Sequence, residues 1–485
     1  MTGQKVFQTQ DLNQFLMMFM LGGITGLVYM MLTPVYWLLF LGIAIMIAVF
    51  INNRVGLLII LVTLFISNWL FGVLRIIPKE LTWLSDVIVM TTTAKMIFLQ
   101  AKEKGLKKTP IDFVLVAILL LGLISALYNR ISPVTLIFGF RNFFKYVLLF
   151  FVFVNIEHDE KFYRHFLILI FILALIQIPV TVIQAHIYGN IGEDIADNVS
   201  GTLGKKATGA MAIFVSFTIS FIIGFYTQHR KIVLIILAIL CLIPIILGSG
   251  QFGFYIVPVA ALICWIYGNP KTLRNLLKIP VMLTALVTLI LVGINFHDNL
   301  YNGKLLDIIK SPSRLYQFNL KLRKEGTFGR FQVIKVSNEI LAEHLPNLII
   351  GTGPGNASES FFNKFQGKLE KQYQGRKIGG IQFTTIILEF GYLGLLLFLY
   401  LFYCLLKMNY KLYCKTPSKF WKSMAVGYNG MVFTFIAGIF YNPVWFYDVL
   451  AFSFWFVSAA LVIQYQKIQE NNLQSIKHSN YFAAN

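Results

Sequence analysis

Two basic residues stand inside an apolar stretch of the chain, where charged side chains are costly and often mark function. Arg141 and Lys145 lie four residues apart in the segment Arg141-Asn142-Phe143-Phe144-Lys145. On a helix this spacing places both side chains on one face, where they could bind an anion between helices. The alternative is that these long side chains reach the lipid headgroups from near the end of a span, which requires no ligand.

A second set of candidates lies in a polar interval, residues 297–378, between two apolar runs. Its motifs are Gly329-Arg330-Phe331, His344-Leu345-Pro346 and Gly351-Thr352-Gly353-Pro354-Gly355. Arginine can bind phosphate oxygens through two N–H groups, and histidine can transfer a proton near neutral pH. Glycines allow a tight turn or a close approach of the backbone to a ligand, so Gly351, Gly353 and Gly355 are candidates for either role.

Two polar residues share one face of the next apolar run, because Gln382 and Glu389 are seven residues apart. Glu389 could accept a proton, and Gln382 could hydrogen-bond a sugar or a phosphate. A carboxyl group in a span can also be purely structural, hydrogen-bonded to a neighbouring helix. Asp86 and Lys95 raise the same question in an earlier run, and an ion pair across helices would explain both.

A shorter polar interval, residues 189–209, contains three carboxylates followed by Lys205 and Lys206. The lysines could hold a phosphate, and the acids could act as a base or hold a cation. The alternative is a solvated surface loop. The spacing of the acids alone is a weak metal signal, so neither a metal site nor a cofactor is predicted.

The elements that must position these residues are membrane helices. Of the 485 residues, 57% are hydrophobic and 13% are charged, whereas about a quarter are charged in a soluble domain. The net charge is +20, and the basic residues cluster between apolar runs. They therefore indicate orientation in the bilayer and contact with anionic lipid rather than binding to nucleic acid.

Apolar runs that could cross a bilayer number about 14, since each span needs roughly 20 residues. The expected spans are residues 15–32, 35–51, 55–74, 81–99, 111–128, 137–156, 166–187, 210–226, 232–247, 252–267, 276–296, 380–406, 424–441 and 449–463. The chain is thus predicted to be an all-α polytopic bundle. Its regions are the spans within 1–296, one large loop at 297–378, the last spans within 379–465, and a short polar, mobile tail at 466–485.

Alternate short connections between these spans differ in charge. One set carries most of the lysines and arginines, including Arg54, Lys107, Arg230, Arg274 and Lys415. Positive residues stay on the cytoplasmic side. Both termini and the polar tail are therefore predicted inside, and the large loop faces the outside.

The large loop itself shows helical spacing. Phe331, Ile334, Leu341 and Leu345 predict an amphipathic helix on the membrane face, which Pro346 then ends. The glycine run is not a nucleotide-binding loop, because no Gly-Lys-Ser/Thr follows it. Cations of the loop and of the outer span ends would meet at one surface, which would suit a lipid-linked diphosphate.

These motifs, in this order and topology, resemble the O-antigen polymerase and ligase superfamily. The resemblance is carried by Gly329-Arg330, Leu345-Pro346, the glycine run 351–355, and Leu388-Glu389-Phe390-Gly391-Tyr392-Leu393-Gly394 after the loop. Phe138-Gly139-Phe140-Arg141 is similar to the family's basic residue at the start of a middle span. Ser200-Gly201-Thr202-Leu203-Gly204 resembles the other periplasmic loop of polymerases.

The resemblance implies a fold like that of C-type glycosyltransferases, in the bacterial inner membrane, with an active face toward the periplasm. It implies that undecaprenyl-diphosphate-linked oligosaccharide repeat units are polymerised into O-antigen or related surface polysaccharide. A hydroxyl of the acceptor sugar would displace undecaprenyl diphosphate from the donor chain. A chain-length regulator protein is a candidate partner.

Residue roles follow from the same resemblance. Arg141 and Arg330 would grip the diphosphate, and the weaker candidates are Lys145, Lys205 and Lys206. The general base would be acidic or a histidine, and the candidates are Glu343, His344 and Glu389. The sequence does not decide among them.

One departure from the family pattern matters. Ligases and many polymerases carry His-Asn at the mouth of the span after the loop, where this chain has Gln382-Phe383. Glutamine cannot act as a general base, which argues against a ligase that transfers glycan to lipid A core. A flippase of lipid-linked oligosaccharide is the other alternative, although it would predict internal repeats that the sequence lacks.

Overall fold

The computed structural model is built of helices and turns, with no strand among the residues that it describes. Those residues are 84–100, 105–156, 159–191, 198–204, 206–248, 250–269, 328–360 and 365–484, with isolated positions in 43–69 and 280–295. The chain divides into two compact units, residues 1–105 and 106–485, and each is described by itself. The all-α prediction is confirmed for this part of the chain.

In the first unit, α4 (Leu84–Gln100) corresponds to the expected span 81–99. The buried hydroxyl of Thr92 donates to the carbonyl of Ile88 at 2.9 Å. Such a bond satisfies a polar group where water is absent. Asp86 and Lys95 both have interaction partners, and the ion pair expected between them stays a prediction.

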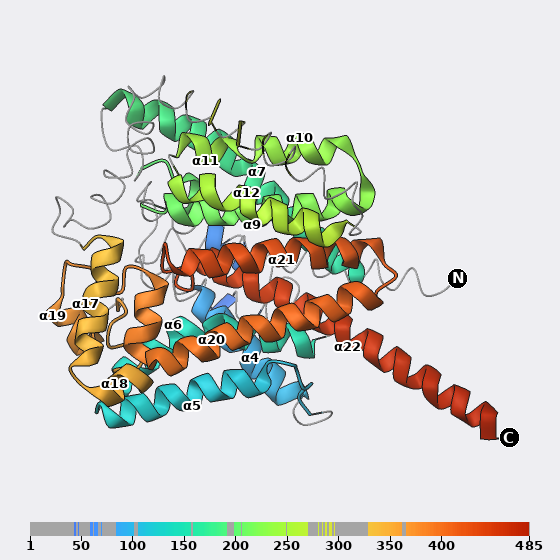
Figure 1. Ribbon diagram of the computed structural model, residues 1–485. Coiled ribbons are helices and arrows are strands. Elements are labelled where there is room, and N and C mark those ends of the chain that lie inside the picture. The colour runs from blue at the N-terminus through green and yellow to red at the C-terminus, as the bar shows by residue number, and fades with distance from the viewer. Residues whose placement is uncertain are drawn as a thin grey trace. The chain divides into compact units, whose positions relative to one another are not determined.

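The second unit contains the remaining labelled helices (Figure 1). They are α5 (Asp112–Tyr128), α6 (Pro133–Asn155), α7 (Glu160–Ile191), α9 (Thr208–His229), α10 (Ile232–Leu240), α11 (Ile243–Leu247), α12 (Gln251–Gly268), α17 (Arg330–Ala342), α18 (Leu345–Ile350), α19 (Lys368–Gln372), α20 (Gln382–Lys415), α21 (Lys419–Ile439) and α22 (Asp448–Ala484). Among the described residues, five helices are long and apolar enough to cross a membrane, namely α6, α7, α9, α20 and α22.

The expected spans from residue 111 to 267 and from 380 to 463 all fall on helices of this unit. Most ends are displaced by a few residues, but α20 and α22 continue past the expected ends at 406 and 463, to Lys415 and Ala484. One of them, 232–247, is divided into α10 and α11. The expected spans 15–32, 35–51, 55–74 and 276–296 lie wholly or mostly outside the described residues. The five long apolar helices agree with a multi-pass membrane protein, and the total of about 14 spans stays a prediction.

Helix α6, which carries Arg141 and Lys145, begins where local sequence favours a start. The Ser132 side chain accepts a hydrogen bond from the Thr135 N–H at 3.2 Å, and Pro133 occupies the first turn. A serine cap satisfies one of the donors left free at a helix start, and a proline there loses no bond. The helix packs along α22.

Helix α20 is broken at Gly391, whose φ of 68° and ψ of −173° lie outside the helical region. The break removes the helical donors that would serve the carbonyls of Leu388 and Glu389. A loop of residues 351–358, here called the glycine corner, supplies them instead: the N–H of Thr352 donates to the Leu388 carbonyl at 2.6 Å, and that of Gly353 to the Glu389 carbonyl at 3.1 Å. The kink and the glycine corner therefore stabilise each other.

The predicted amphipathic helix is present as α17, but its buried face differs from the expected one. Leu341 is fully buried, whereas Phe331 is 54% exposed and Leu345 is 71% exposed. The helix ends at Ala342, before Pro346, and Pro346 lies in the first turn of α18. The expectation that Pro346 stops a helix is wrong, since a proline is compatible with a helix start.

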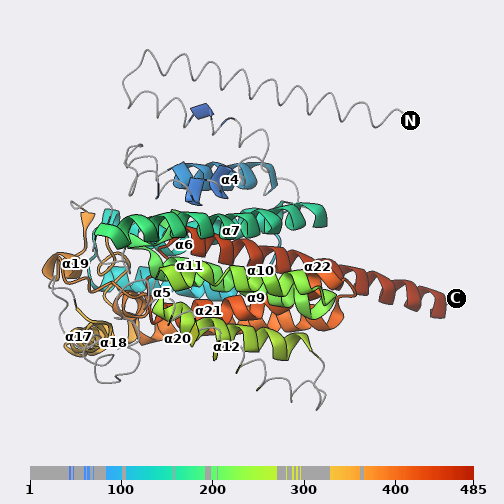
Figure 2. The same cartoon turned by 90° about the horizontal axis from the view of Figure 1, so that it is seen from above.

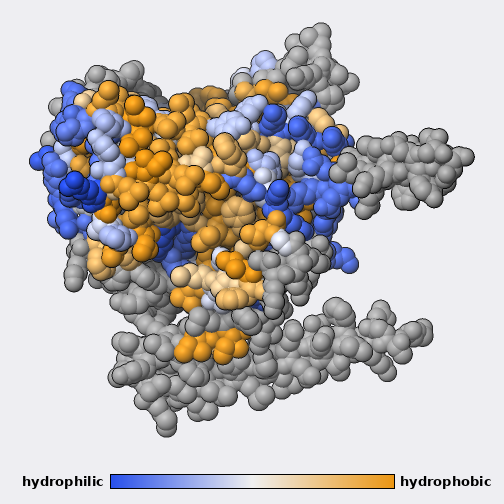
Figure 3. All heavy atoms as spheres, turned by 90° about the horizontal axis from the view of Figure 1, so that it is seen from below, coloured by the Kyte–Doolittle hydropathy of each residue, from blue (hydrophilic) through white to orange (hydrophobic). Residues whose placement is uncertain are grey.

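Within the second unit, α17, α18 and α19 lie at one end of the long helices, and the turn between α20 and α21 lies at the other (Figures 1 and 2). On the face drawn in Figure 3, hydrophobic residues form a broad band with hydrophilic residues at both ends. Helix α10 exposes Ile232, Val233, Ile236 and Ile239. Apolar faces of this kind suit contact with lipid rather than water.

The C-terminal segment, expected as a polar tail after residue 465, continues α22 to Ala484. In both ribbon views this part of α22 extends past the neighbouring helices of the unit (Figures 1 and 2). Polar residues with good helix propensity can prolong a packed helix without burying a face of their own.

Candidate functional site

Several of the predicted residues meet at the connection between α21 and α22, residues 440–447. This α21–α22 connection lies at the same end of the unit as the starts of α9, α12 and α20. Phe252 at the start of α12 stacks on Tyr441, with ring centroids 4.6 Å apart. A Cβ added to Gly209, at the start of α9, would meet the Asn442 side chain. Local sequence brings none of these segments together.

Arg330 approaches the first half of the connection. Its Nε donates to the carbonyl of Tyr441 at 3.2 Å, and its guanidinium carbon lies 3.8 Å from the centroid of the Tyr441 ring. A guanidinium stacked on an aromatic ring remains charged and keeps N–H groups at its edge. Arg330 is half-buried, so its position is set while part of the side chain faces outward.

Lys145 approaches the other end of the connection. Its ammonium lies 3.2 Å and 3.4 Å from the two carboxylate oxygens of Asp448, the first residue of α22. The Lys145 side chain is 6% exposed and that of Asp448 is 32% exposed. Burying an ammonium requires a partner of opposite charge, so Lys145 is a paired residue here. The alternative, in which the Lys145 side chain only reaches the lipid headgroups, does not account for this ion pair.

Arg141 lies one helical turn before Lys145 on α6 and is half-buried. Its guanidinium donates to the side-chain oxygen of Asn142 at 3.3 Å, alongside a further contact. Helix α6 is held against the connection by Trp445, whose indole N–H donates to the carbonyl of Phe143 at 2.9 Å. Arg141 is thus on the helix that borders the connection, two residues before the Phe143 carbonyl that Trp445 contacts.

Gln382 lies at the first turn of α20 and is fully buried. Its side-chain oxygen accepts the backbone N–H of Trp445 at 3.0 Å, and its own backbone N–H donates to the Asn442 carbonyl at 3.2 Å. Among the described residues its side-chain nitrogen has no hydrogen-bond partner. Leaving a buried donor unpaired costs about 1–3 kcal/mol, so Gln382 could donate to a bound ligand.

Glu389 is also fully buried, but its contacts are of another kind. One of its carboxylate oxygens accepts the backbone N–H groups of Ala357 and Ser358, at 3.2 Å and 2.7 Å. The other oxygen has no hydrogen-bond partner in the described part of the chain. The carboxylate thereby anchors the glycine corner to α20, as in the structural alternative for a carboxyl group in a span. Its predicted catalytic role stays a prediction.

The three glycines of the corner have φ values of 79°, 99° and 83°. The N–H groups of Gly351, Thr352 and Gly353 all bond to carbonyls within the protein, and the Gly351 carbonyl accepts the hydroxyl of Ser125 at 2.9 Å. Residues 351–358 are buried. The corner therefore joins α5 to the kink of α20, and its use in substrate binding stays a prediction.

Two motifs that are far apart in the sequence meet at this corner. A Cβ at Gly139 of α6 would collide with the backbone of Pro354 and Gly355. Phe138 stacks on Phe365, with centroids 5.6 Å apart. The segment before Arg141 is thus fitted to the loop that follows Arg330.

The remaining predicted residues lie elsewhere. His344 precedes α18 and is exposed, as is Glu343. Lys206 is exposed, directly after the buried turn Gly201–Leu203, and Lys205 lies outside the described residues. That turn is held by α7, whose Gln177 and Gln184 accept backbone N–H groups of the segment at 2.8 Å.

Sequence reasoning missed Asp448, Trp445 and Glu370. The first two lie in an aromatic segment between two expected spans, and a carboxylate at the start of a span was a usable signal. Glu370 is 6% exposed in α19. Burial, together with the nearby carboxylates of Glu359 and Glu389, raises its pKa to about 7. No local pattern could have shown this, because its neighbours come from other segments.

Metal binding has no evident centre in the described residues. No group of three His, Cys, Asp or Glu side chains there could hold an ion.

Comparison with known proteins gives no assignment: no family model matches the chain, and no curated protein matches it.

Proposed function

We propose that this chain is a glycosyltransferase that polymerises oligosaccharide repeat units carried on undecaprenyl diphosphate, at the periplasmic face of the bacterial inner membrane. The observation that supports it best is the gathering of Arg330, Lys145 and Gln382 on the α21–α22 connection. These side chains come from three segments distant in sequence. Cations and an unpaired donor around one short segment suit an anionic group such as a diphosphate.

In the proposed reaction, a hydroxyl oxygen of the acceptor sugar forms a bond to the anomeric carbon of the donor chain. The bond from that carbon to the diphosphate oxygen breaks, and the electron pair leaves on undecaprenyl diphosphate. The hydroxyl proton passes to a base of the protein. Arg330 and Arg141 would stabilise the negative charge that develops on the leaving diphosphate.

Asp448 and Glu370 join the candidates for the base. Asp448 is part-exposed at the connection itself, and its pairing with Lys145 holds the carboxylate in place. Glu370 has a pKa of about 7, which suits a group that accepts and returns a proton near neutral pH. Glu389 is a weaker candidate on geometry, because its carboxylate binds the backbone of the glycine corner.

The test is reconstitution of the purified full-length chain in liposomes with a synthetic undecaprenyl-diphosphate-linked repeat unit. Lengthened lipid-linked glycans are expected without any other protein. We expect Arg330→Ala to lower the rate by about 100-fold or more, the size of effect typical for a group that stabilises charge in the transition state. Arg376→Ala is the matched control, because Arg376 is exposed in the same loop and also lies over a ring, 5.6 Å from that of Phe328.

Two other results would replace the proposal. Transfer only to lipid A core, with no lengthening of the lipid-linked glycan, would identify a ligase. Movement of the intact lipid across the bilayer without a new glycosidic bond would identify a flippase. Equal transfer rates for Arg330→Ala and Arg376→Ala would contradict the proposed binding of the diphosphate by Arg330.

A further inference from the structure

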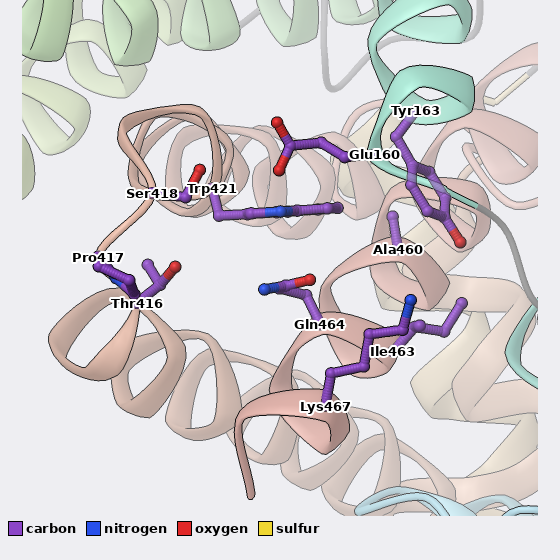
Figure 4. A pocket seen from close by; sticks show the side chains of 10 residues that line it. All are labelled: Glu160, Tyr163, Thr416, Pro417, Ser418, Trp421, Ala460, Ile463, Gln464 and Lys467. Carbon is purple, nitrogen blue, oxygen red and sulfur yellow. The ribbon is translucent and has the colours of Figure 1, made fainter. Parts of the chain in front are cut away.

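A pocket of about 180 Å³ lies at the other end of the second unit (Figure 4). It is formed where the start of α7, the turn between α20 and α21, the first residues of α21, and residues 460–467 of α22 meet. The lining residues are Glu160, Tyr163, Thr416, Pro417, Ser418, Trp421, Ala460, Ile463, Gln464 and Lys467. No predicted site residue is among them, so the pocket is separate from the site described above.

The position of the pocket indicates what kind of molecule reaches it. Helices α7, α20 and α22 are candidate spans, and the pocket lies where their apolar parts give way to polar residues. In a bilayer this is the level of the lipid headgroups. The helix ends on both sides of the α20–α21 turn also carry Lys415, Lys419 and Lys422, which would attract phosphate groups of the lipid leaflet at that end.

One polar atom of the lining has no partner in the described part of the chain. The Thr416 hydroxyl belongs to a residue that is 2% exposed, and it has no hydrogen-bond partner among the described residues. Figure 4 shows the side chains of Thr416 and Gln464 on one side of the Trp421 ring, and the Lys467 ammonium beyond Gln464, beside Ile463. A hydroxyl, an amide and an ammonium offer the hydrogen bonds and the positive charge that a phosphodiester requires.

A negative group stands near the same ring. The Glu160 carboxylate lies beside Trp421 in Figure 4. Both of its bonds to Arg164 use the same oxygen, at 2.8 Å from Nε and 2.5 Å from a terminal guanidinium nitrogen. The second oxygen and the face of the indole can both attract a small cation.

We propose that this pocket binds the headgroup of a phospholipid with an amino group, of the phosphoethanolamine type. Lys467, Gln464 and Thr416 hold the phosphate, and Glu160 with Trp421 receives the ammonium. The volume agrees, since 180 Å³ is the liquid volume of roughly six waters, about that of a headgroup of eight heavy atoms. The Glu160 oxygen that Arg164 does not use leaves room for an ammonium beside the phosphate, which a headgroup without an amino group would not fill.

The test is native mass spectrometry of the delipidated full-length chain, titrated separately with phosphatidylethanolamine, phosphatidylglycerol and phosphatidylcholine. We expect phosphatidylethanolamine to bind about ten times more tightly than the other two. Lys467→Ala should weaken binding of all three lipids about tenfold, and Glu160→Gln should remove only the preference for phosphatidylethanolamine. Lys411→Ala is the control, because Lys411 is an exposed lysine at the same end of α20 outside the pocket.

Several outcomes would overturn the proposal. Equal binding by Lys467→Ala and Lys411→Ala would show that the pocket holds no lipid phosphate. If phosphatidylglycerol bound most strongly and Glu160→Gln did not change this, the proposed ammonium site would be contradicted. Full competition by soluble phosphoethanolamine at the same concentration would identify a soluble ligand in place of a lipid. Lipid retention is measured without glycosyl transfer, so the result is independent of the proposed function.

Discussion

The glycine corner and the α21–α22 connection both dock on α6 and α20, but they use their polar groups differently. In the corner, the N–H groups of residues 351–353 bond within the protein, and the Glu389 carboxylate binds two more. At the connection, Arg330 is stacked yet part-exposed, and the side-chain nitrogen of Gln382 has no partner among the described residues. Each region keeps one buried polar atom without a partner in the described part of the chain, the second Glu389 oxygen and the Gln382 nitrogen, but the connection also has the part-exposed Arg330 against it. We therefore expect the corner to position the site and the connection to contact a ligand.

The largest expected effect on stability is at the corner. Gly351→Ala should destabilise the fold by about 3 kcal/mol, because left-handed φ costs roughly 1–2 kcal/mol for a side chain and overpacking adds a similar amount. An added Cβ at Gly351 would lie 2.5 Å from the backbone nitrogen of Gly391. The measurement is the thermal unfolding midpoint in detergent.

Gly375→Ala is the matched control for this change. Gly375 has a φ of 83°, close to the 79° of Gly351, but an added Cβ there meets no atom within 4 Å. Gly375→Ala should therefore destabilise the fold only by the cost of the positive φ, without the cost of overpacking. If Gly351→Ala and Gly375→Ala unfold at the same temperature, the close packing of the glycine corner against the α20 kink does not stabilise the fold.

An intermediate effect is expected at the ion pair of the connection. Lys145→Met should destabilise the chain by about 2 kcal/mol, because it leaves the part-buried Asp448 carboxylate without its partner. The double variant Lys145→Met/Asp448→Asn should recover most of that loss, since no uncompensated charge remains. Thermal unfolding of the single and double variants measures this.

The rate of glycan transfer by the Lys145/Asp448 double variant also tests whether the connection, unlike the corner, contacts a ligand. If the connection binds the diphosphate, the double variant should stay folded and still transfer glycans more slowly than the parent chain. Normal stability together with a normal rate in the double variant would contradict a role of Lys145 in ligand binding.

The smallest effect is expected at Glu370. Its pKa is raised to about 7 in the folded chain, from 4.5 without the burial. Between these values the folded state binds the proton more strongly, so stability is greater at low pH and falls as pH rises toward 7. Glu370→Gln should remove this dependence and stabilise the chain by about 1 kcal/mol at pH 8.

Unfolding midpoints at pH 5 and pH 8 measure this effect, with Glu343→Gln as the control. Glu343 is exposed and is not among the carboxylates that raise the pKa of Glu370. A parent chain whose stability does not fall from pH 5 to pH 8 would rule out the raised pKa of Glu370. A Glu370→Gln variant of normal stability that no longer transfers glycans would instead support a role as the base.

Helices were the most predictable part of the fold. The expected span 111–128 is α5 (Asp112–Tyr128), whereas α6 begins at Pro133, four residues before the expected span 137–156, because Ser132 caps it. Pro346 was misread because a proline can either follow a helix or lie in the first turn of the next one. The buried face of α17 was misjudged because helical spacing shows which residues share a face, but not which face packs against the rest of the protein.

The candidate site was less predictable, because its partners are distant in the chain. Lys145 and Asp448 are 303 positions apart, and Trp445 and Phe143 are 302 apart. The sequence showed that Lys145 was unusual in an apolar run, but not that a carboxylate would pair with it. Glu389 was likewise recognised as unusual, while its bonds to the glycine corner depend on the kink at Gly391.

The sequence by itself determined that the described chain is helical and rich in apolar runs, because a backbone away from water must satisfy its own N–H and C=O groups. It also determined where basic residues stand along the chain. Only the tertiary structure decided which charges are paired, which glycines are packed against backbone, and which donors face a pocket. Those properties depend on burial and on contacts between distant segments, and neither is encoded in local spacing.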